Sequence, residues 1–509
     1  MAELKIYRAG KLLTAYNATV GTTLYNAIRE AGVPFEAPCG GRGKCGKCLV
    51  RLTPDGPWVK ACETTLEGDG EVYLPDALAM KIAGDAEGAA AKPASTQLGI
   101  AVDIGTTTVV CHLLDLNSCE KLATASNVNA QRTFGADVIS RIQYCAENGH
   151  SMLTQLIQNQ LKELILQACN KAGADPKNIR RISLAGNTIM QHLAADMSPV
   201  GMGVAPFTPL SLFGFEVPNN GLYPIAEDAV IYYAPCVYSY VGGDITVGML
   251  ASGLENMDGP CVYIDIGTNG EIALKANGRY YCCATAAGPA FEGAEIAKGM
   301  AAVPGAISHV TWGENGLELT ILGDNVPPEG LCGSGLMDAL AVLVETGAVD
   351  ETGRLVDAEE LPGHPIAKHL GKREGLSVFW LSEEHDVYMI PRDVRKLQLA
   401  KAAIAAGIQT LLQTAGISEE DVASFIIAGG FGSFLDKTST AKVGLFPKRF
   451  LPFAKSLGNM AGEGAVLALC SEQARRDIQN IMDNFEVVEL STSPIFNEQF
   501  VEQMMFDNE

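Results

Sequence analysis

Long apolar segments are missing from this 509-residue chain, although 47% of its residues are hydrophobic. No uninterrupted apolar run approaches the length that spans a bilayer, and the first ten residues, MAELKIYRAG, lack the apolar stretch of a secretion signal. The sequence therefore argues against a membrane protein. It predicts a cytoplasmic, globular protein with enough residues for about three domains.

Basic residues are also scarce, because 37 Lys and Arg stand against 59 Asp and Glu and give a formal net charge of −22. An acidic surface repels a phosphate backbone, so we expect no nucleic-acid partner. The scarcity is uneven. Residues 1–60 carry a net charge of +5 and the remainder carries −27, so the two parts are electrostatically different modules.

Disulfides are not expected for the fourteen cysteines of a cytoplasmic chain, which are more typical of buried thiols or metal ligands. Ten of them lie among apolar or small residues, and we predict that they are core thiols. These are Cys111, Cys119, Cys145, Cys169, Cys236, Cys261, Cys282, Cys283, Cys332 and Cys470.

The other four cysteines form the pattern Cys39-x5-Cys45-x2-Cys48-x13-Cys62 in a glycine-rich, basic stretch. Glycines let backbone N–H groups approach inorganic sulfide, and the neighbouring Lys and Arg offset the charge of the thiolates. The spacing is close to that of plant-type [2Fe–2S] ferredoxins. A structural zinc site is the alternative, but such sites more often use two separated Cys-x2-Cys pairs, and only one is present. The pattern therefore favours a [2Fe–2S] cluster.

Residues 1–78 resemble a β-grasp ferredoxin, with a hairpin turned near Gly10, a helix capped by Thr22 or Thr23, the cysteine loop and later strands. Residues 79–97 are rich in Ala, Gly and small polar residues, so we expect a linker there. A flexible coil of this length spans roughly 20–25 Å. We hypothesise that it lets the cluster domain swing between an electron source and an electron acceptor.

Two apolar stretches, 98–114 and 261–274, each break at an Asp-Ile-Gly-Thr sequence and become apolar again. This pattern predicts two hairpins of buried strands whose bends expose backbone N–H groups and side-chain donors. Such a bend can hold a phosphate. One Asp-x-Gly-Thr sequence is also a common tight turn, so the repetition carries the argument.

Alternating strands and helices are predicted from residue 98 onward, as in an α/β fold. We expect helices over 136–148, 152–172 and 391–414, and an irregular insertion over the Pro- and Gly-rich residues 199–236. An anion-binding turn is predicted at Gly333-Ser334, at the start of a helix, and a glycine-rich turn follows a buried strand at residues 429–432.

The paired hairpins and the late Ala-Gly-Gly-Phe-Gly turn resemble the actin, sugar-kinase and heat-shock ATPase superfamily, whose two lobes are ribonuclease-H-like. The resemblance covers 98–475, with lobes 98–258 and 259–475 and an extension over 476–509. It implies that Asp103 and Asp265 organise Mg²⁺ and the attacking water beside bound ATP, and Glu271 is a further candidate for water activation. The candidate nucleotide-binding residues are Gly105, Thr106, Thr107, Thr108, Asn187, Gly267, Thr268, Asn269, Gly270, Gly333, Ser334, Gly429, Gly430, Phe431 and Gly432.

One family joins a ferredoxin-like domain to such an ATPase: the reductive activators of corrinoid proteins. The segments LAGNTIMQHL, YVGGDITVGML, GPAFEGAEI and LCGSGLMDA, together with both hairpins and the four cysteines, are similar to that family. The resemblance implies ATP-dependent transfer of one electron from the cluster to a Co(II) corrinoid, which restores Co(I) for methyl transfer. It also implies a corrinoid-protein partner and an external low-potential electron donor, and it raises a homodimer as a further expectation.

Two other functions remain open on the residues alone. The core could be a small-molecule kinase with a regulatory cluster, which would need a carboxylate positioned as base toward a substrate hydroxyl. It could also be a nucleotide-gated binding module in which the cluster acts as a redox sensor.

Overall fold

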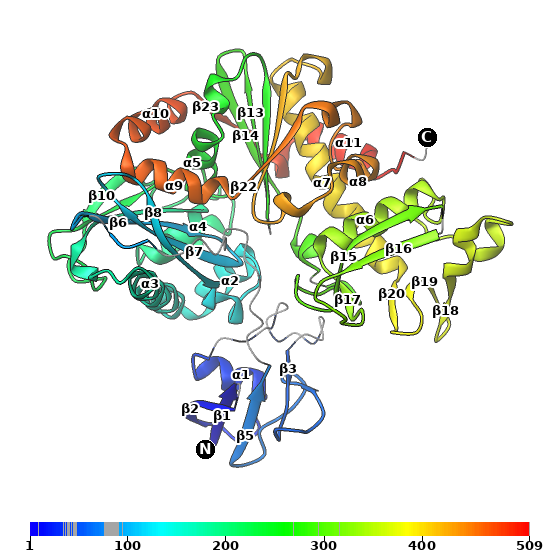
Figure 1. Ribbon diagram of the computed structural model, residues 1–509, viewed down its shortest axis with the longest axis horizontal. Coiled ribbons are helices and arrows are strands. Elements are labelled where there is room, and N and C mark those ends of the chain that lie inside the picture. The colour runs from blue at the N-terminus through cyan, green and yellow to red at the C-terminus, as the bar shows by residue number, and fades with distance from the viewer. Residues whose placement is uncertain are drawn as a thin grey trace.

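The computed structural model describes residues 1–8, 10–33, 35, 37, 41, 43, 48–75, 91–93, 95–267, 269–293, 295–314 and 316–507. Figure 1 shows a small N-terminal sheet beneath two larger lobes, each of which is built on a six-stranded sheet. Within the described part of the chain, no helix is long and apolar enough to cross a membrane.

The N-terminal part has a mixed sheet of order β2-β1-β5 and one helix. Strands β1 and β2 pair antiparallel, β1 and β5 pair parallel, and β3 pairs with β4 in a separate two-stranded sheet. The elements are β1 (Ala2–Arg8), β2 (Lys11–Ala18), α1 (Leu24–Glu30), β3 (Leu49–Val50), β4 (Val59–Lys60) and β5 (Gly70–Leu74). The Thr23 hydroxyl accepts a hydrogen bond from the Asn26 N–H and caps α1, which confirms one of the two predicted caps.

The first lobe contains a sheet of order β10-β11-β9-β6-β7-β8, in which β6, β7 and β8 are antiparallel and β6, β9 and β11 are parallel. Its strands are β6 (Leu98–Ile104), β7 (Thr108–Asp115), β8 (Lys121–Val128), β9 (Ile179–Gly186), β10 (Phe215–Pro218) and β11 (Val230–Tyr233). The expectation of an irregular insertion over 199–236 was wrong in part. The β-branched and aromatic run of β11 pairs with β9 despite the surrounding Pro and Gly.

The two helices predicted over 136–148 and 152–172 are confirmed to within about two residues as α2 (Val138–Asn148) and α3 (Ser151–Ala172). A 3₁₀ turn, η1 (Ala130–Thr133), precedes α2, and α4 (Thr188–Ala194) follows β9. Helix α3 buries Leu153, Ile157 and Leu161 against the sheet and ends at Gly173, which has φ of 64°.

The second lobe's sheet has the order β22-β21-β12-β13-β14-β23, which repeats the first lobe's β11-β9-β6-β7-β8 in its first five strands. The sixth strand differs, because β23 is added beside β14, whereas β10 is added at the opposite edge, beside β11. The strands are β12 (Cys261–Ile266), β13 (Gly270–Ala276), β14 (Arg279–Thr285), β21 (Ser424–Ala428), β22 (Ala454–Gly458) and β23 (Phe485–Val487). Strands β12 to β14 form an antiparallel meander, and β21 and β22 add in parallel beside β12. The two sheets therefore share the ribonuclease-H-like order that was predicted for this part of the chain.

Further elements extend the second lobe. Two three-stranded sheets comprise β15 (Ala306–Gly313), β16 (Gly316–Ile321) and β17 (Gly330–Leu331), and β18 (Leu370–Arg373), β19 (Leu376–Ser382) and β20 (Val387–Met389). The helices are α6 (Gly333–Glu345), α7 (Pro391–Thr414), α8 (Lys437–Val443) and α11 (Pro494–Glu502). The bounds predicted for α7 are confirmed.

Helices α5 (Gly243–Ala251), α9 (Met460–Cys470) and α10 (Glu472–Met482) lie on the first lobe's sheet, although α9 and α10 follow the second lobe in sequence (Figure 1). The backbones of α5 and α9 are in close contact, because a Cβ at Gly464 would lie 2.2 Å from the Val247 carbonyl oxygen. The other side of α5 packs on the second lobe through Ile245 and Met249. This helix therefore joins the two sheets.

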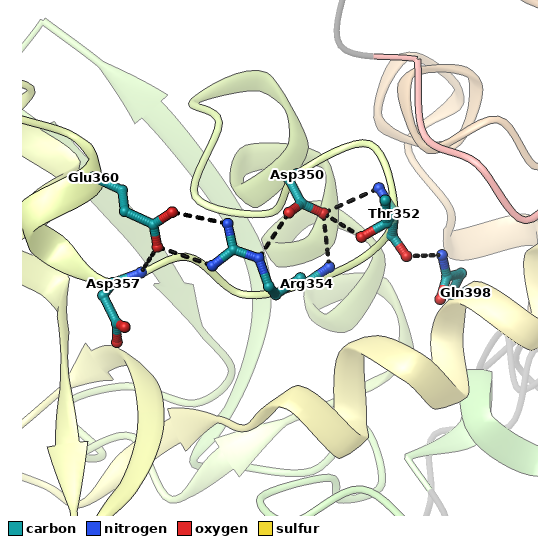
Figure 2. A network of polar contacts seen from close by, with 6 residues as sticks. All are labelled: Asp350, Thr352, Arg354, Asp357, Glu360 and Gln398. Atoms are coloured by element: carbon teal, nitrogen blue, oxygen red, sulfur yellow. Dashed lines mark hydrogen bonds and ion pairs between the residues drawn. The ribbon is translucent and has the colours of Figure 1, made fainter.

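The last residues are part of the second lobe. Strand β23 pairs with β14, and Phe506 is buried in the core. Figure 2 shows how the loop after α6 is held: Arg354 bridges Asp350 and Glu360, and Gln398 Nε2 donates to the Thr352 carbonyl at 2.9 Å. The same Gln398 nitrogen donates to the Met504 carbonyl at 2.7 Å, so one buried amide binds both segments to α7.

The prediction that ten cysteines are core thiols holds for eight of them and was wrong for two. Cys119 is exposed in the turn between β7 and β8, and Cys470 at the end of α9 is only partly buried. Cys119 lies in a turn and Cys470 is the last residue of its helix, so the apolar context in the sequence does not produce burial at either position. Cys282 and Cys283 are both buried because β14 is covered on both faces.

Candidate functional site

The two predicted hairpins are formed by β6–β7 and β12–β13, and each carries an aspartate next to the end of its first strand. Asp103 precedes Ile104 on β6, and Asp265 precedes Ile266 on β12. Asp265 lies directly opposite Glu271 in the antiparallel pair. The repeated topology therefore places the two aspartates at equivalent points of the two sheets.

Four carboxylates form one electrostatic group at these strand ends. Burial raises the pKa of Asp103 to about 6, and the hydrogen bond from Asn459 opposes this rise. Burial and then the charge of Asp103 raise the pKa of Asp265 to about 7. Burial also raises the pKa of Glu271 and of Asp244 far above the usual range, and in both cases the charge of Asp265 adds to the effect.

Asp244 was not among the residues proposed from the sequence, although it lies in the first turn of α5. Gly242 before it packs onto the turn after β9, where a Cβ would lie 2.4 Å from the Asn187 Cα. The signal that could have identified it is a Gly-Gly-Asp sequence at the start of an apolar helix.

Asn459 is a second residue that sequence reasoning missed. Its Nδ2 donates to Asp103 Oδ2 at 2.8 Å, and its Oδ1 accepts the Gly462 N–H at 2.9 Å as the N-cap of α9. An Asn before an apolar helix predicts a cap, but the contact with Asp103 spans more than 350 residues and leaves no local pattern.

The first hairpin is held by side chains from both lobes. Asn187 Nδ2 donates to the Thr106 hydroxyl at 2.9 Å, which brings together two residues proposed from the sequence. The Thr107 hydroxyl donates to the carboxylate of Glu292 in the second lobe at 3.1 Å, and Thr108 opens β7. A Cβ at Gly105 would lie 2.7 Å from the Thr108 carbonyl oxygen, so the bend is too tight for a side chain there.

The second hairpin is closed by the Gly267 N–H, which donates to the Asn269 carbonyl at 3.0 Å. The Gly270 carbonyl accepts the Thr285 hydroxyl at 2.9 Å, and the Asn269 side chain is hydrogen-bonded to Glu271. Thr268 lies outside the described residues. The Gly267 N–H is therefore engaged within the bend itself.

The glycine turn after β21 lies directly against the second hairpin. Gly429 has φ of 95°, and a Cβ there would lie 2.5 Å from the Ile266 carbonyl oxygen and 2.6 Å from Asp265 Oδ1. Both the conformation and the contact therefore require glycine at this position. Gly430 is exposed beside it, and Gly432 is buried.

The structure also brings Phe431 to the start of α6. Its ring stacks on Phe291 with centroids 5.8 Å apart, and a Cβ at Gly333 would lie 2.1 Å from the Phe431 ring. The hydroxyl of the buried Ser334 donates to the Ser308 carbonyl at 2.8 Å, so in this arrangement it supports β15.

Only part of the predicted cluster site is described. Cys39 and Cys45 lie outside the described residues, while the sulfur atoms of Cys48 and Cys62 are 3.2 Å apart. Two thiolates bound to one metal at about 2.3 Å must lie within about 4 Å of each other, so this pair fits a shared metal.

The donor chemistry around the two hairpins fits Mg²⁺ with a bound nucleotide. Among the described residues, no group of three His, Cys, Asp or Glu could hold a metal alone. Mg²⁺ at nucleotide sites usually takes one or two carboxylates and completes its shell with phosphate oxygens and waters. The clustered Asp103, Asp244, Asp265 and Glu271 supply more negative charge than one cation requires.

A four-cysteine ferredoxin-like domain followed by two ribonuclease-H-like lobes with facing acidic hairpins defines an iron–sulfur ATPase. Comparison with protein families agrees along the chain. Residues 7–75 match the 2Fe-2S iron-sulfur cluster binding domain, residues 98–257 match the RACo middle region, and residues 259–509 match the C-terminal domain of RACo, the ASKHA domain. The protein therefore has a [2Fe–2S] cluster, ATP and Mg²⁺ as its cofactors.

Individual relatives cover most of the chain. The corrinoid activation enzyme RamQ of Eubacterium limosum is 36% identical over 422 residues, which are 80% of this chain and 70% of that protein. A reductase of the Co(II) methylated amine-specific corrinoid protein, from Methanosarcina barkeri, is 24% identical over 74% of this chain and 71% of that protein. A solved reductive activator for corrinoid, iron-sulfur protein superposes with a TM-score of 0.71 at 30% identity, covering 99% of this chain and 98% of that one. The chain belongs to this family, the RACo family of reductive activators.

Proposed function

We propose that this protein couples ATP binding and hydrolysis to the delivery of one electron to a Co(II) corrinoid protein, which restores the Co(I) form used in methyl transfer. One observation carries the proposal: a single chain contains both a ferredoxin-like domain and a pair of acidic hairpins. The carboxyl groups of these hairpins are close enough to shift one another's pKa values. The [2Fe–2S] cluster supplies single-electron chemistry and returns to its reduced state from an external low-potential donor.

We assign the cluster to Cys39, Cys45, Cys48 and Cys62, and the nucleotide to the two hairpins and the turn at 429–432. Backbone N–H groups of the hairpins hold phosphate oxygens, and Gly429 lets the turn approach Asp265. Asp103 and Asp265 position the metal and the attacking water. Glu271 is our candidate general base, because it lies directly opposite Asp265 in the strand pair and burial raises its pKa, which makes its carboxylate a stronger base.

The division of the chain follows from these assignments. We propose a cluster domain over 1–78, a linker over 79–97, an ATPase domain over 98–475 with lobes 98–258 and 259–475, and a C-terminal extension over 476–509. The end of the linker is held by the first lobe, since the Ala91 N–H donates to the Leu122 carbonyl and the Leu116 N–H to the Gln97 carbonyl.

The corrinoid is expected to belong to the partner protein. None of the seven histidines stands in an Asp-x-His-x-x-Gly context, the sequence pattern that would supply a cobalt ligand. We expect the +5 cluster region to steer an acidic donor or acceptor, and we retain a cytoplasmic location and a homodimer as predictions.

The test is an anaerobic assay that combines the protein, ATP, Mg²⁺, a reductant and a Co(II) corrinoid protein. Wild-type protein is expected to produce the Co(I) spectrum only with ATP. Cys62→Ala should abolish Co(I) formation and the cluster spectrum, and the buried, non-cluster Cys169→Ala is the matched control that should change neither. No Co(I) with the wild type, or an unchanged yield from Cys62→Ala, would refute the proposal.

A further inference from the structure

Among the described residues, the ferredoxin-like domain is hydrogen-bonded to the first lobe at Thr133, the last residue of η1. The Tyr25 hydroxyl donates to the Thr133 carbonyl at 3.1 Å, and the Phe35 N–H donates to the Thr133 hydroxyl at 3.1 Å. All three residues are buried. Figure 1 shows α1, which carries Tyr25, on the side of the small sheet that faces the lobes.

Tyr25 also contacts the segments that carry the cluster cysteines. A Cβ at Gly41, between Cys39 and Cys45, would lie 2.4 Å from the Tyr25 ring, so the ring packs directly on that backbone. The Tyr25 N–H donates to the carbonyl of Ala61, the neighbour of Cys62, at 3.0 Å. One side chain therefore joins the cluster region to the ATPase lobe.

The turn η1, on which Tyr25 docks, is tied in turn to the first hairpin. Asn129 caps η1 by accepting the Gln131 N–H at 2.9 Å. Its own N–H donates to the Thr107 carbonyl at 2.8 Å, and its Nδ2 donates to the Gly105 carbonyl at 2.9 Å. A movement of the hairpin backbone must therefore move the start of η1.

Arg141 of α2 makes a second, parallel connection. Its guanidinium donates to the Thr106 carbonyl at 2.5 Å, to Gln131 Oε1 at 3.2 Å and to the Gly135 carbonyl at 3.0 Å. The side chain is completely buried, and these acceptors are uncharged. Its charge therefore lies one hydrogen bond from the hairpin backbone, where a bound anion would add to the effect of the Asp137 and Glu292 carboxylates and stabilise it.

We propose that Asn129, Arg141 and η1 form a relay that positions the ferredoxin-like domain according to the nucleotide state, with Tyr25 and Thr133 as its docking contact. The relay rests on the proposed function only in that ATP occupies the first hairpin. Docking orders η1, and an ordered η1 fixes the carbonyls of Gly105 and Thr107, so the hairpin is preorganised for phosphate. Docking and ATP binding therefore strengthen each other, and loss of the γ-phosphate favours release of the domain.

The relay can be tested directly, because thermodynamic coupling is reciprocal. If bound ATP strengthens docking of the ferredoxin-like domain, then loss of the docking contact must weaken ATP binding by the same factor. Tyr25→Phe removes the hydroxyl that reaches Thr133 and makes no change near the hairpin. We expect the full-length, cluster-loaded variant to bind the non-hydrolysable analogue AMPPNP about five-fold more weakly than the wild type. Thr133→Val, which removes the acceptor for the Phe35 N–H from the other side of the contact, should act in the same direction.

Tyr7→Phe is the matched control, since the Tyr7 hydroxyl donates to the exposed Glu71 on the same small domain at 3.3 Å. It should leave AMPPNP affinity unchanged. Hydrogen exchange gives a second readout: AMPPNP should slow exchange of residues 24–33 and 129–134 in the wild type, and this protection should be lost in Tyr25→Phe. The visible spectrum of the cluster verifies that each variant is loaded.

Wild-type affinity in both Tyr25→Phe and Thr133→Val would overturn the relay, and so would an equal loss in Tyr7→Phe. A wild-type protein that shows the coupling but forms no Co(I) would refute the proposed function and leave the relay standing. A protein that forms Co(I) while both docking variants bind AMPPNP normally would refute only the relay.

Discussion

The acidic group at the two hairpins should make the nucleotide-free protein less stable as the pH rises, and Asp265→Asn should remove much of this effect. Burial raises the pKa of Asp265 from 3.8 to about 7 in the folded protein. Between these two values the folded state holds a proton that the unfolded chain has lost, so stability falls as pH rises through this window. A difference of about three pKa units corresponds to about 4 kcal/mol, which is an upper limit because Asp265 is only partly buried.

Asparagine has nearly the shape of aspartate and does not ionise. At pH 8 the variant should therefore be more stable than the wild type by up to about 4 kcal/mol, which for a lobe of this size raises the melting temperature by up to roughly 10 °C. At pH 5 wild-type Asp265 is protonated in the folded protein but ionised in the unfolded chain, so the gap should shrink to about 1.6 kcal/mol.

The assay is differential scanning calorimetry at pH 5 and pH 8, with chelator and without nucleotide. Asp258→Asn, at an exposed position, is the control for the loss of one negative charge. Mg²⁺ and ATP should raise the melting temperature of the wild type at pH 8 and should raise that of Asp265→Asn only slightly. The reasoning is refuted if Asp265→Asn melts at or below the wild type at pH 8, or if the gap is equal at both pH values.

Three further substitutions separate the parts of the molecule. Asp103→Ala should abolish ATP-dependent Co(I) formation while the visible spectrum of the cluster stays intact, and loss of that spectrum would contradict the assignment. Glu271→Gln should lower the rate constant of ATP hydrolysis by about 10²–10⁴-fold with little change in nucleotide affinity, whereas a normal rate would exclude Glu271 as general base. Gln398→Leu leaves the partly buried carbonyls of Thr352 and Met504 without their donor, which should cost about 1–3 kcal/mol and speed proteolysis of the C-terminal residues. Unchanged proteolysis would show that this amide is dispensable.

Local sequence patterns were sufficient for the elements of this fold whose structure depends on their own residues. The hairpins at Asp103 and Asp265, the N-cap at Thr23 and the long helix after Pro391 each carry a local signal, and each is present. The strand order of each sheet could also be predicted, because connection rules allow only a few arrangements of a repeated hairpin-and-strand pattern within one sheet.

Contacts between distant segments could not be predicted in the same way. Asn459 reaches Asp103 from the far end of the ATPase, and Glu292 reaches Thr107 from the other lobe. Asp244 follows a Gly-Gly pair at the start of an apolar helix, but this local signal does not reveal that it joins Asp265 and Glu271. Asp244 and Asn459 owe their roles to the packing of α5 and α9, whereas Glu292 reaches the hairpin from η5 (Pro289–Glu292). No single stretch of sequence encodes these contacts.

Charge at the first hairpin connects the two proposals. Asp103 belongs to a group of carboxylates that repel one another, and this group favours the binding of a divalent cation. The buried guanidinium of Arg141 donates to uncharged groups that include the Thr106 carbonyl of the hairpin, and its charge favours the binding of an anion. Mg²⁺ with ATP supplies both charges at once, whereas either ion alone would stabilise only the carboxylates or only the guanidinium. Nucleotide binding should therefore be felt most strongly at Gly105–Thr107, which is also the segment that Asn129 connects to the docking contact of the ferredoxin-like domain.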